Sequence, residues 1–240
     1  MTAHAYGLLG RSADALRVLL RLEQELERRG TGVRYAGVQH TYRSWILRNL
    51  GDPGAEELAL AGLEVAGSQE IRAQCHLDLA DCLLRTGDLA GAADRLEVAE
   101  TESGTRWFHN KWRFDQRRGL LLARLALAGR DAPAAAAAAE PVLAAAEERG
   151  DARYAVLGRL VLATAQGRLG SGVDEAGLAA DLEALGDVAA LEGWWLAAEV
   201  ADATGSAHAR TVAEGLAERV ARDAEEHEEG FRTVAAARLS

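Results

Sequence analysis

Glycine-containing turns recur along this chain at a spacing that fits stacked helical hairpins. Six of them are separated by intervals of 41, 36, 42, 41 and 35 residues, and repeats of this length are typical of units made of two helices. The turn glycines are Gly10, Gly51, Gly87, Gly129, Gly170 and Gly205. Glycine adopts a positive φ at the end of a helix at little cost. The recurrence predicts an all-α protein.

Residues 76–100, HLDLADCLLRTGDLAGAADRLEVAE, form the clearest copy of the repeat. The tetratricopeptide pattern is W-x2-L-G-x2-Y followed by A-x3-F. His76 takes the tryptophan position, Leu79 and Ala80 take the Leu-Gly positions, and Ala92 and Leu96 match the second helix. The small Ala80 and Ala92 allow two helices to approach closely. The predicted fold is an all-α, tetratricopeptide-like right-handed superhelix of stacked antiparallel hairpins.

The pattern predicts one repeat domain over residues 1–240 with about 11 helices. The repeats are expected near residues 1–30, 34–66, 69–103, 107–149, 152–187 and 188–238. The helices are expected near 12–29, 34–50, 54–66, 69–86, 89–102, 107–129, 132–149, 152–169, 174–186, 188–204 and 207–227, with a final piece to about 238. Little sequence precedes Gly10, so the first repeat is expected to be truncated and the chain to continue upstream in a longer protein.

Charge and composition exclude several classes of function. The formal net charge is -10, whereas a general binder of nucleic acid or of an anionic membrane needs a basic surface. Lys111 is the only lysine among 27 basic residues, so the arginines reflect coding bias more than selection for phosphate binding. No apolar run is long enough to span a bilayer and no signal peptide is recognisable. We expect a cytoplasmic protein that contacts neither membrane nor nucleic acid directly.

No catalytic or metal-binding motif is found in the sequence. The phosphate loop, the nucleophile elbow and the H-E-x-x-H helix are missing, and the six histidines are scattered. The acidic run at residues 225–229 is interpreted as a solvated helix face rather than a metal site. Cys75 and Cys82 lie about 10 Å apart along a helix, too far for a disulfide, and are expected to be reduced core residues. No enzyme activity and no cofactor are predicted.

The segment RWFHNKWRFDQRR, residues 106–118, is the most unusual stretch of the chain. It begins the first helix of its repeat, and first helices are expected to line the concave surface of a hairpin array. His109, Trp112, Arg113 and Gln116 are therefore candidate binding residues that offer stacking, charge and hydrogen bonds. The alternative is that the aromatic residues fill a packing gap. Aromatics interleaved with arginine also occur in nucleic-acid readers, but the acidic chain argues against that function.

A second candidate patch lies on the two preceding first helices. Its residues are Tyr42, Trp45, Arg48, Asn49, Gln74, Asp81 and Arg85. The alternative for Tyr42 and Trp45 is a place in the core. Trp194 and Trp195 are adjacent and point about 100° apart on a helix, so one is expected in the core and the other at the end of the groove.

Three stretches resemble a known class of repeat region: residues 42–64, residues 106–131 and the late run LEGWWLAAEVADATGSAHARTVAEGLAERV. They are similar to the tetratricopeptide regions of large actinobacterial STAND-type signal-transduction ATPases and LuxR-like transcriptional regulators. The resemblance implies a sensor or scaffold region, with the ATPase and any DNA-binding module upstream in a longer chain. Several copies lack the tryptophan, Leu-Gly and tyrosine of the pattern.

These observations favour a non-catalytic repeat domain that binds a protein, a peptide or a small-molecule inducer in its concave groove. It would belong to the C-terminal part of a larger signalling or transcriptional regulator and contact the upstream domains of that chain. Two alternatives are the peptide or small-molecule receptor domain of a helix-turn-helix regulator, and a stand-alone adaptor between proteins. An all-α enzyme is the fourth hypothesis, and it lacks an acid–base or metal set.

Overall fold

The computed structural model describes residues 2–29, 36–104 and 110–240, and within these ranges the protein is helical and contains no strand. The helices are α1 (Thr2–Leu8), α2 (Ser12–Arg29), α3 (Val38–Asn49), α4 (Gly54–Glu64), α5 (Gln69–Thr86), α6 (Leu89–Ser103), α7 (Lys111–Ala128), α8 (Ala132–Arg149), α9 (Ala152–Arg168), α10 (Glu175–Val188), α11 (Ala190–Thr204), α12 (Ala207–Arg222), the 3-10 helix η2 (Glu225–His227) and α13 (Glu228–Leu239). The predicted all-α class is confirmed. The described ranges hold 13 α-helices where about 11 were predicted.

The first hairpin begins with a short helix that the sequence analysis did not place. The short α1 precedes Gly10 and packs against α2, α3 and α11. Its Gly7 faces the ring of Trp45 so closely that a Cβ at this position would lie 2.3 Å from a ring carbon. Seven residues are enough to cover this side of the hairpin because a residue without a side chain allows direct contact with a large aromatic ring. The first repeat thus contains both helices, and its first helix is only seven residues long.

The six turn glycines all lie between the two helices of a hairpin, as predicted. Five of them have a positive φ, with values between 66° and 87°: Gly10, Gly51, Gly87, Gly170 and Gly205. The sixth turn differs. Gly129 has a φ of −74°, and the left-handed conformation falls on Arg130, with a φ of 62°. This turn holds its left-handed residue one position after the glycine.

Short polar side chains cap the N-termini of six of the described helices. The side chains of Ser68, Asp88, Asp131, Asp151, Asp174 and Ser206 each accept a hydrogen bond from the backbone N–H three residues later. Asp88, for example, accepts from the N–H of Gly91 at 2.9 Å. Such caps satisfy donors that a helix leaves without an internal partner. In the last four hairpins, a glycine near the end of the first helix and a capping side chain at the start of the second define the turn locally.

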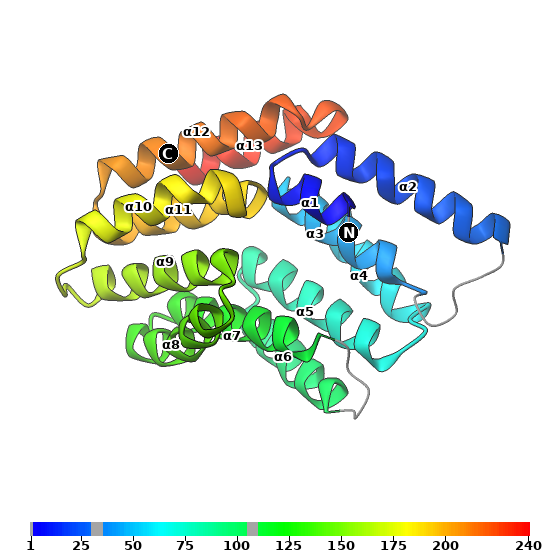
Figure 1. The fold of residues 1–240 in the computed structure, drawn as a ribbon, viewed down its shortest axis with the longest axis horizontal. Helices are drawn as coiled ribbons and strands as arrows, with labels where there is room; N and C mark the ends of the chain where they lie inside the picture. Colours follow the sequence, from blue (N-terminus) through cyan, green and yellow to red (C-terminus); the bar gives the residue numbers. More distant parts are fainter. Residues whose placement is uncertain (1, 30–35, 105–109) are drawn as a thin grey trace.

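Helices α3, α5, α7, α9 and α11 form a closed inner ring (Figure 1). Each contacts the next along the chain, and α11 also contacts α3. Each of these helices pairs with the helix that follows it, so α4, α6, α8, α10 and α12 pack around the ring. The small α1 fills the junction between α3 and α11. The first helices of the second to sixth hairpins therefore share one interior, whereas the sequence analysis expected them to line the concave surface of a superhelix.

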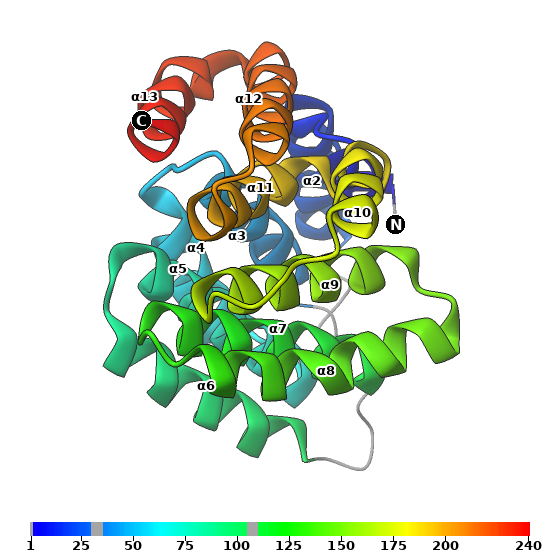
Figure 2. The ribbon, with the colours of Figure 1, turned by 90° about the vertical axis from the view of Figure 1, so that its left-hand side faces the viewer.

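Contacts between the two halves of the chain close the ring. The indole N–H of Trp194 donates to the carbonyl of Asn49 at 3.3 Å, and the hydroxyl of Ser12 donates to the carbonyl of Asp223 at 3.1 Å. A Cβ added to Gly51 would lie 2.6 Å from Val234 on α13. Figure 2 shows α12 and α13 beside the first hairpin at one end of the molecule. The first and last hairpins of the chain therefore pack against each other.

The core between these layers consists largely of small residues. On α8, Ala135, Ala139 and Ala146 are fully buried. Both cysteines are buried and free, which confirms the prediction made for them. None of the described helices is both long and apolar enough to cross a bilayer.

Candidate functional site

The inner ring surrounds a cavity of about 350 Å³ whose walls come from α1, α3, α5, α7, α9 and α11. The apolar and aromatic part of the wall consists of Val38, Tyr42, Trp45, Ile71, Leu120, Leu121, Tyr154, Leu157, Val161, Trp195 and Leu196. Binding sites for compact organic molecules have this size and this mostly apolar lining with a few polar groups. The cavity is therefore the candidate site, and the inner helices supply its walls.

Charged side chains line the same cavity, and the cations outnumber the carboxylates. Six arginines reach the wall: Arg48, Arg85, Arg113, Arg117, Arg124 and Arg153. Three carboxylates do so: Glu70, Asp81 and Glu192. Asp78 and Glu199 add two carboxylates through ion pairs with the lining arginines, so cations exceed carboxylates by one (six against five). The chain as a whole carries a net charge of -10, so the interior is positive relative to the rest of the molecule.

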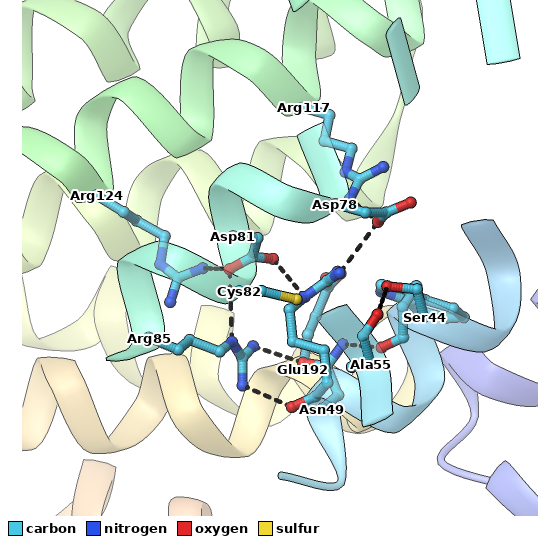
Figure 3. A network of polar contacts seen from close by, with 12 residues as sticks. Ser44, Asn49, Ala55, Asp78, Asp81, Cys82, Arg85, Arg117, Arg124 and Glu192 are labelled. Carbon is cyan, nitrogen blue, oxygen red and sulfur yellow. Dashed lines mark hydrogen bonds and ion pairs between the residues drawn. The ribbon is translucent and has the colours of Figure 1, made fainter. Parts of the chain in front are cut away.

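Asp81 is the centre of an ion-pair network at one end of the cavity (Figure 3). Its Oδ1 accepts from Arg124 at 3.2 Å and from Arg85 at 3.4 Å. Its Oδ2 lies 2.8 Å from Nε of Arg48, an ion pair whose direction does not satisfy hydrogen-bond geometry. Arg48 also donates to Oδ1 of the fully buried Asp78 at 3.0 Å. The network joins α3, α5 and α7 through charges that are almost entirely removed from water.

The network changes the pKa values of its members in opposite directions. Burial alone raises the pKa of Asp81, but the surrounding arginines, Arg48 first, hold it well below its usual range. Burial lowers the pKa of Arg48, and the carboxylates of Asp81 and Asp78 more than offset this and raise it. For Arg85, burial dominates and the neighbouring Arg124 and Arg48 add to it, so its pKa is lowered to about 10. Cations are thus in excess even where the network is densest.

A second ion pair lies beside the aromatic wall. Arg153 on α9 donates to Oε1 of Glu192 on α11 at 2.6 Å and 2.9 Å, and its guanidinium lies 6.0 Å from the ring centre of Trp45. The imidazole of His4 packs against Trp45 with ring centres 5.4 Å apart. Burial, followed by the charges of Arg153 and Arg113, lowers the pKa of His4 to about 4. His4 is therefore neutral at physiological pH and surrounded by positive charge.

Arg113 differs from the other five lining arginines because it has no carboxylate partner among the described residues. Its side chain is exposed, and its guanidinium lies 5.2 Å from the ring centre of Trp112. One turn further along α7, Arg117 is bound to Asp78 and donates to Gln74 at 3.2 Å. Asn110, which precedes α7, also lines the cavity and makes no side-chain cap to the first turn. This end of the cavity therefore presents an unpaired cation next to a helix N-terminus.

The structure brings seven of the eleven predicted site residues to the cavity wall. They are Tyr42, Trp45, Arg48, Gln74, Asp81, Arg85 and Arg113. Trp194 is fully buried, as expected for one member of this pair, and Trp195 lines the cavity.

The other four predicted residues lie elsewhere or outside the described ranges. Asn49 is buried, donates to the carbonyl of Trp45 at 2.7 Å and accepts from Arg85, so it fixes the wall from behind. Gln116 is buried and its amide has no hydrogen-bond partner in the described structure. Trp112 is half-buried and lies 5.5 Å from the guanidinium of Arg149 on α8. It therefore faces α8 rather than the cavity. His109 lies outside the described residues.

Sequence reasoning missed Arg117, Arg124, Arg153 and Glu192, although the signal for two of them was present. Residues 113, 117 and 124 fall at i, i+4 and i+11, which places three arginines on one face of α7. The same spacing relates residues 74, 78 and 85 on α5. Polar stripes on helices that are buried on both sides mark a polar interior. The pair Arg153 and Glu192 has no such signal, since the two residues lie 39 positions apart on different helices.

Within residues 2–29, 36–104 and 110–240, no cluster of three or more His, Cys, Asp or Glu side chains could hold a metal ion. Comparison with protein-family models, with curated proteins and with solved structures finds no match for this chain.

Proposed function

We propose that this protein is a non-catalytic recognition domain that binds a small molecule or a short peptide segment in the cavity of the inner ring. The observation that carries the proposal is the 350 Å³ cavity itself, with aromatic, aliphatic and charged groups converging on it from six helices. Contacts between α3 and α11 close the ring, so its inner helices surround the cavity from all sides. This favours a compact ligand over the docking of a whole protein.

The resemblance of the repeats to those of large bacterial regulators extends the proposal to signalling. We propose tetratricopeptide-like hairpins that act as the cytoplasmic sensor region of a larger regulator of the STAND or LuxR-like type. The ring offers a means of coupling, because a ligand in the cavity touches helices from both halves of the chain. A ligand that prefers one arrangement of these helices shifts the population toward that arrangement. Such coupling needs binding energy and no chemical step.

Binding of a neutral fluorescent dye, N-phenyl-1-naphthylamine, tests the cavity as a binding site. We expect one dye per chain, with an emission increase that is lost in Leu157→Trp, because Leu157 lines the cavity and the larger ring fills it. Leu169→Trp is the matched control, since Leu169 is 51% exposed and lies outside the cavity. Circular dichroism and urea unfolding establish that both variants are folded. A dye that binds Leu157→Trp as tightly as the wild type contradicts the proposal.

The adaptor hypothesis makes a different prediction. A surface adaptor captures the same partner proteins whether or not the cavity is filled. Pull-down with the wild type and with Leu157→Trp, read out by mass spectrometry, separates the two. Loss of a bound molecule in the variant supports a cavity ligand, and an unchanged set of captured proteins supports the adaptor.

A further inference from the structure

We propose that the cavity selects an organic oxyanion, a compact molecule with an apolar or aromatic body and one carboxylate-like or phosphate-like group that pairs with Arg113. This inference rests on the proposed function, because it names the class of ligand for the same cavity. It is carried by the arrangement of charges in the wall rather than by the size of the cavity.

The first step of the argument is the pairing of the lining arginines. Arg48, Arg85 and Arg124 all meet Asp81, and Arg153 meets Glu192. These cations already have carboxylate partners within the wall, and replacing those partners by a ligand would cost as much as it gains. Arg113 lines the cavity and has no carboxylate partner among the described residues. A ligand can therefore pair with Arg113 without breaking an existing ion pair.

The second step is the surroundings of Arg113. Arg117 lies one turn away on the same face of α7, and Asn110 begins that helix at the cavity wall. An uncapped helix N-terminus presents backbone N–H groups and a partial positive charge. After burial, the charges of Arg153 and Arg113 also oppose the protonation of His4, so its ring lies within the field of the same cations. Arg113 and the N-terminus of α7 therefore both contribute positive potential to this part of the cavity.

The third step is the body of the ligand. Leu120, Leu121 and Leu157 also line the cavity and form an apolar part of its wall. All three side chains are less than a tenth exposed. The aromatic rings of Trp45 and Tyr154 lie beside them. An inorganic ion would leave this apolar wall in contact with water, whereas an acid with an aromatic or aliphatic body would cover it. The site therefore fits an amphipathic anion better than phosphate or chloride alone.

A matched pair of dyes tests the charge preference. 1-Anilinonaphthalene-8-sulfonate carries the same anilinonaphthalene body as N-phenyl-1-naphthylamine with one added sulfonate. We expect the anionic dye to bind the wild type at least tenfold more tightly than the neutral dye at low salt, and the difference to shrink as salt rises. In Arg113→Gln the affinity for the anionic dye should fall about tenfold, while that for the neutral dye changes less than twofold.

Two control variants separate charge from folding. Arg118 is five positions further along α7, lies outside the cavity and contacts the carbonyl of Leu96 and the carboxylate of Glu100, so Arg118→Gln should leave both dyes unaffected. Arg113→Lys keeps the charge and should retain most of the anion preference. Competition by 2-naphthoate, 2-naphthyl phosphate and 2-naphthol then distinguishes the headgroup. Displacement of the anionic dye by either acid, more strongly than by the naphthol, supports the proposal and identifies carboxylate or phosphate.

The outcomes that overturn the anion proposal differ from those that overturn cavity binding. Equal affinity for the two dyes, with both lost in Leu157→Trp, removes the anion preference and leaves the cavity as a binding site. An Arg113→Gln variant that binds the anionic dye normally also removes it. Anionic dye that binds Leu157→Trp unchanged lies outside the cavity and overturns the proposal together with the function on which it rests.

Discussion

The two ends of the cavity place the same residue type under opposite electrostatic conditions. Arg124 and Arg113 lie on the same face of α7, eleven residues or about 16 Å apart along the helix axis. Arg124 is 14% exposed and bound to Asp81 and Glu199, whereas Arg113 is exposed and has no carboxylate partner among the described residues. Pairing and burial, rather than residue type, therefore separate an arginine that holds the ring together from one that is free to bind a ligand.

The comparison predicts its largest effect at the carboxylate that binds three arginines. Asp81→Asn removes the charge that offsets Arg48, Arg85 and Arg124 and leaves three cations together in a buried place. We expect the free energy of unfolding to fall by about 3–5 kcal/mol, the cost of breaking a buried ion pair. Urea denaturation monitored by circular dichroism measures it.

The matched control for this variant is Asp115→Asn on the neighbouring helix. Asp115 is exposed and pairs with Lys111, and an exposed pair of this kind contributes less than about 1 kcal/mol. If Asp81→Asn is no more destabilising than Asp115→Asn, the network does not stabilise the ring and the contrast between the two ends disappears.

The second effect concerns His4 and depends on pH. The pKa of His4 is about 4 in the folded protein and 6.5 in an unfolded chain. Above pH 6.5 both states are neutral. Between pH 6.5 and 4 the unfolded state binds a proton that the folded state excludes, so the free energy of unfolding falls as the pH is lowered, by at most about 3 kcal/mol.

NMR titration of the His4 ring protons and urea denaturation at pH 7.5 and 5 measure this dependence. His4→Asn should reduce the loss of stability between the two pH values, and the exposed His208→Asn should not. A ligand anion bound beside Arg113 should raise the pKa of His4. A His4 with a pKa near 6.5 in the free protein would contradict both its burial and the positive charge around its ring.

Arg117 lies between the two extremes and should give an intermediate effect. It pairs with the fully buried Asp78 but is itself 22% exposed. Arg117→Gln leaves Asp78 with Arg48 as its remaining charged partner, so we expect a loss of about 1–2 kcal/mol by urea denaturation. Arg118→Gln, which removes a pair with the half-exposed Glu100, should lose less than about 0.5 kcal/mol. If the two variants lose the same free energy of unfolding, the ion pair between Arg117 and Asp78 does not contribute to the stability of the network.

The local features of the fold could be predicted from the sequence, whereas the closure of the ring could not. Gly51 and Gly87 marked their turns because a left-handed residue at a helix end is a local requirement. The contacts of Gly51 with Val234 and of Trp194 with Asn49 join residues more than 140 positions apart. No periodicity in one sequence reports such a pair, and the short α1 was missed because its fit depends on the ring of Trp45.

The candidate site, too, could be predicted only where local sequence patterns determine which way a residue faces. Trp45, Asp81 and Arg85 were found because they occupy repeated positions on first helices, whose inward orientation follows from the hairpin pattern. Trp112 was placed in the groove because its unusual segment begins the first helix of a repeat, and the structure turns it toward Arg149. One residue along, Arg113 does line the cavity. Adjacent positions on a helix point about 100° apart, so a segment rich in aromatics and arginines does not identify which of its members faces inward.

The smallest expected effect on stability is also the one that best defines the comparison. Arg113→Gln removes a cation that has no carboxylate partner in the described structure, so the free energy of unfolding should change by less than about 0.5 kcal/mol, as for most exposed substitutions. Urea denaturation of this variant beside Asp81→Asn measures both ends of the cavity with one method. Combined with its predicted loss of anion binding, an unchanged stability assigns Arg113 to the ligand. A loss of 2 kcal/mol or more would instead place Arg113 in the structural network, and the two ends of the cavity would then be alike.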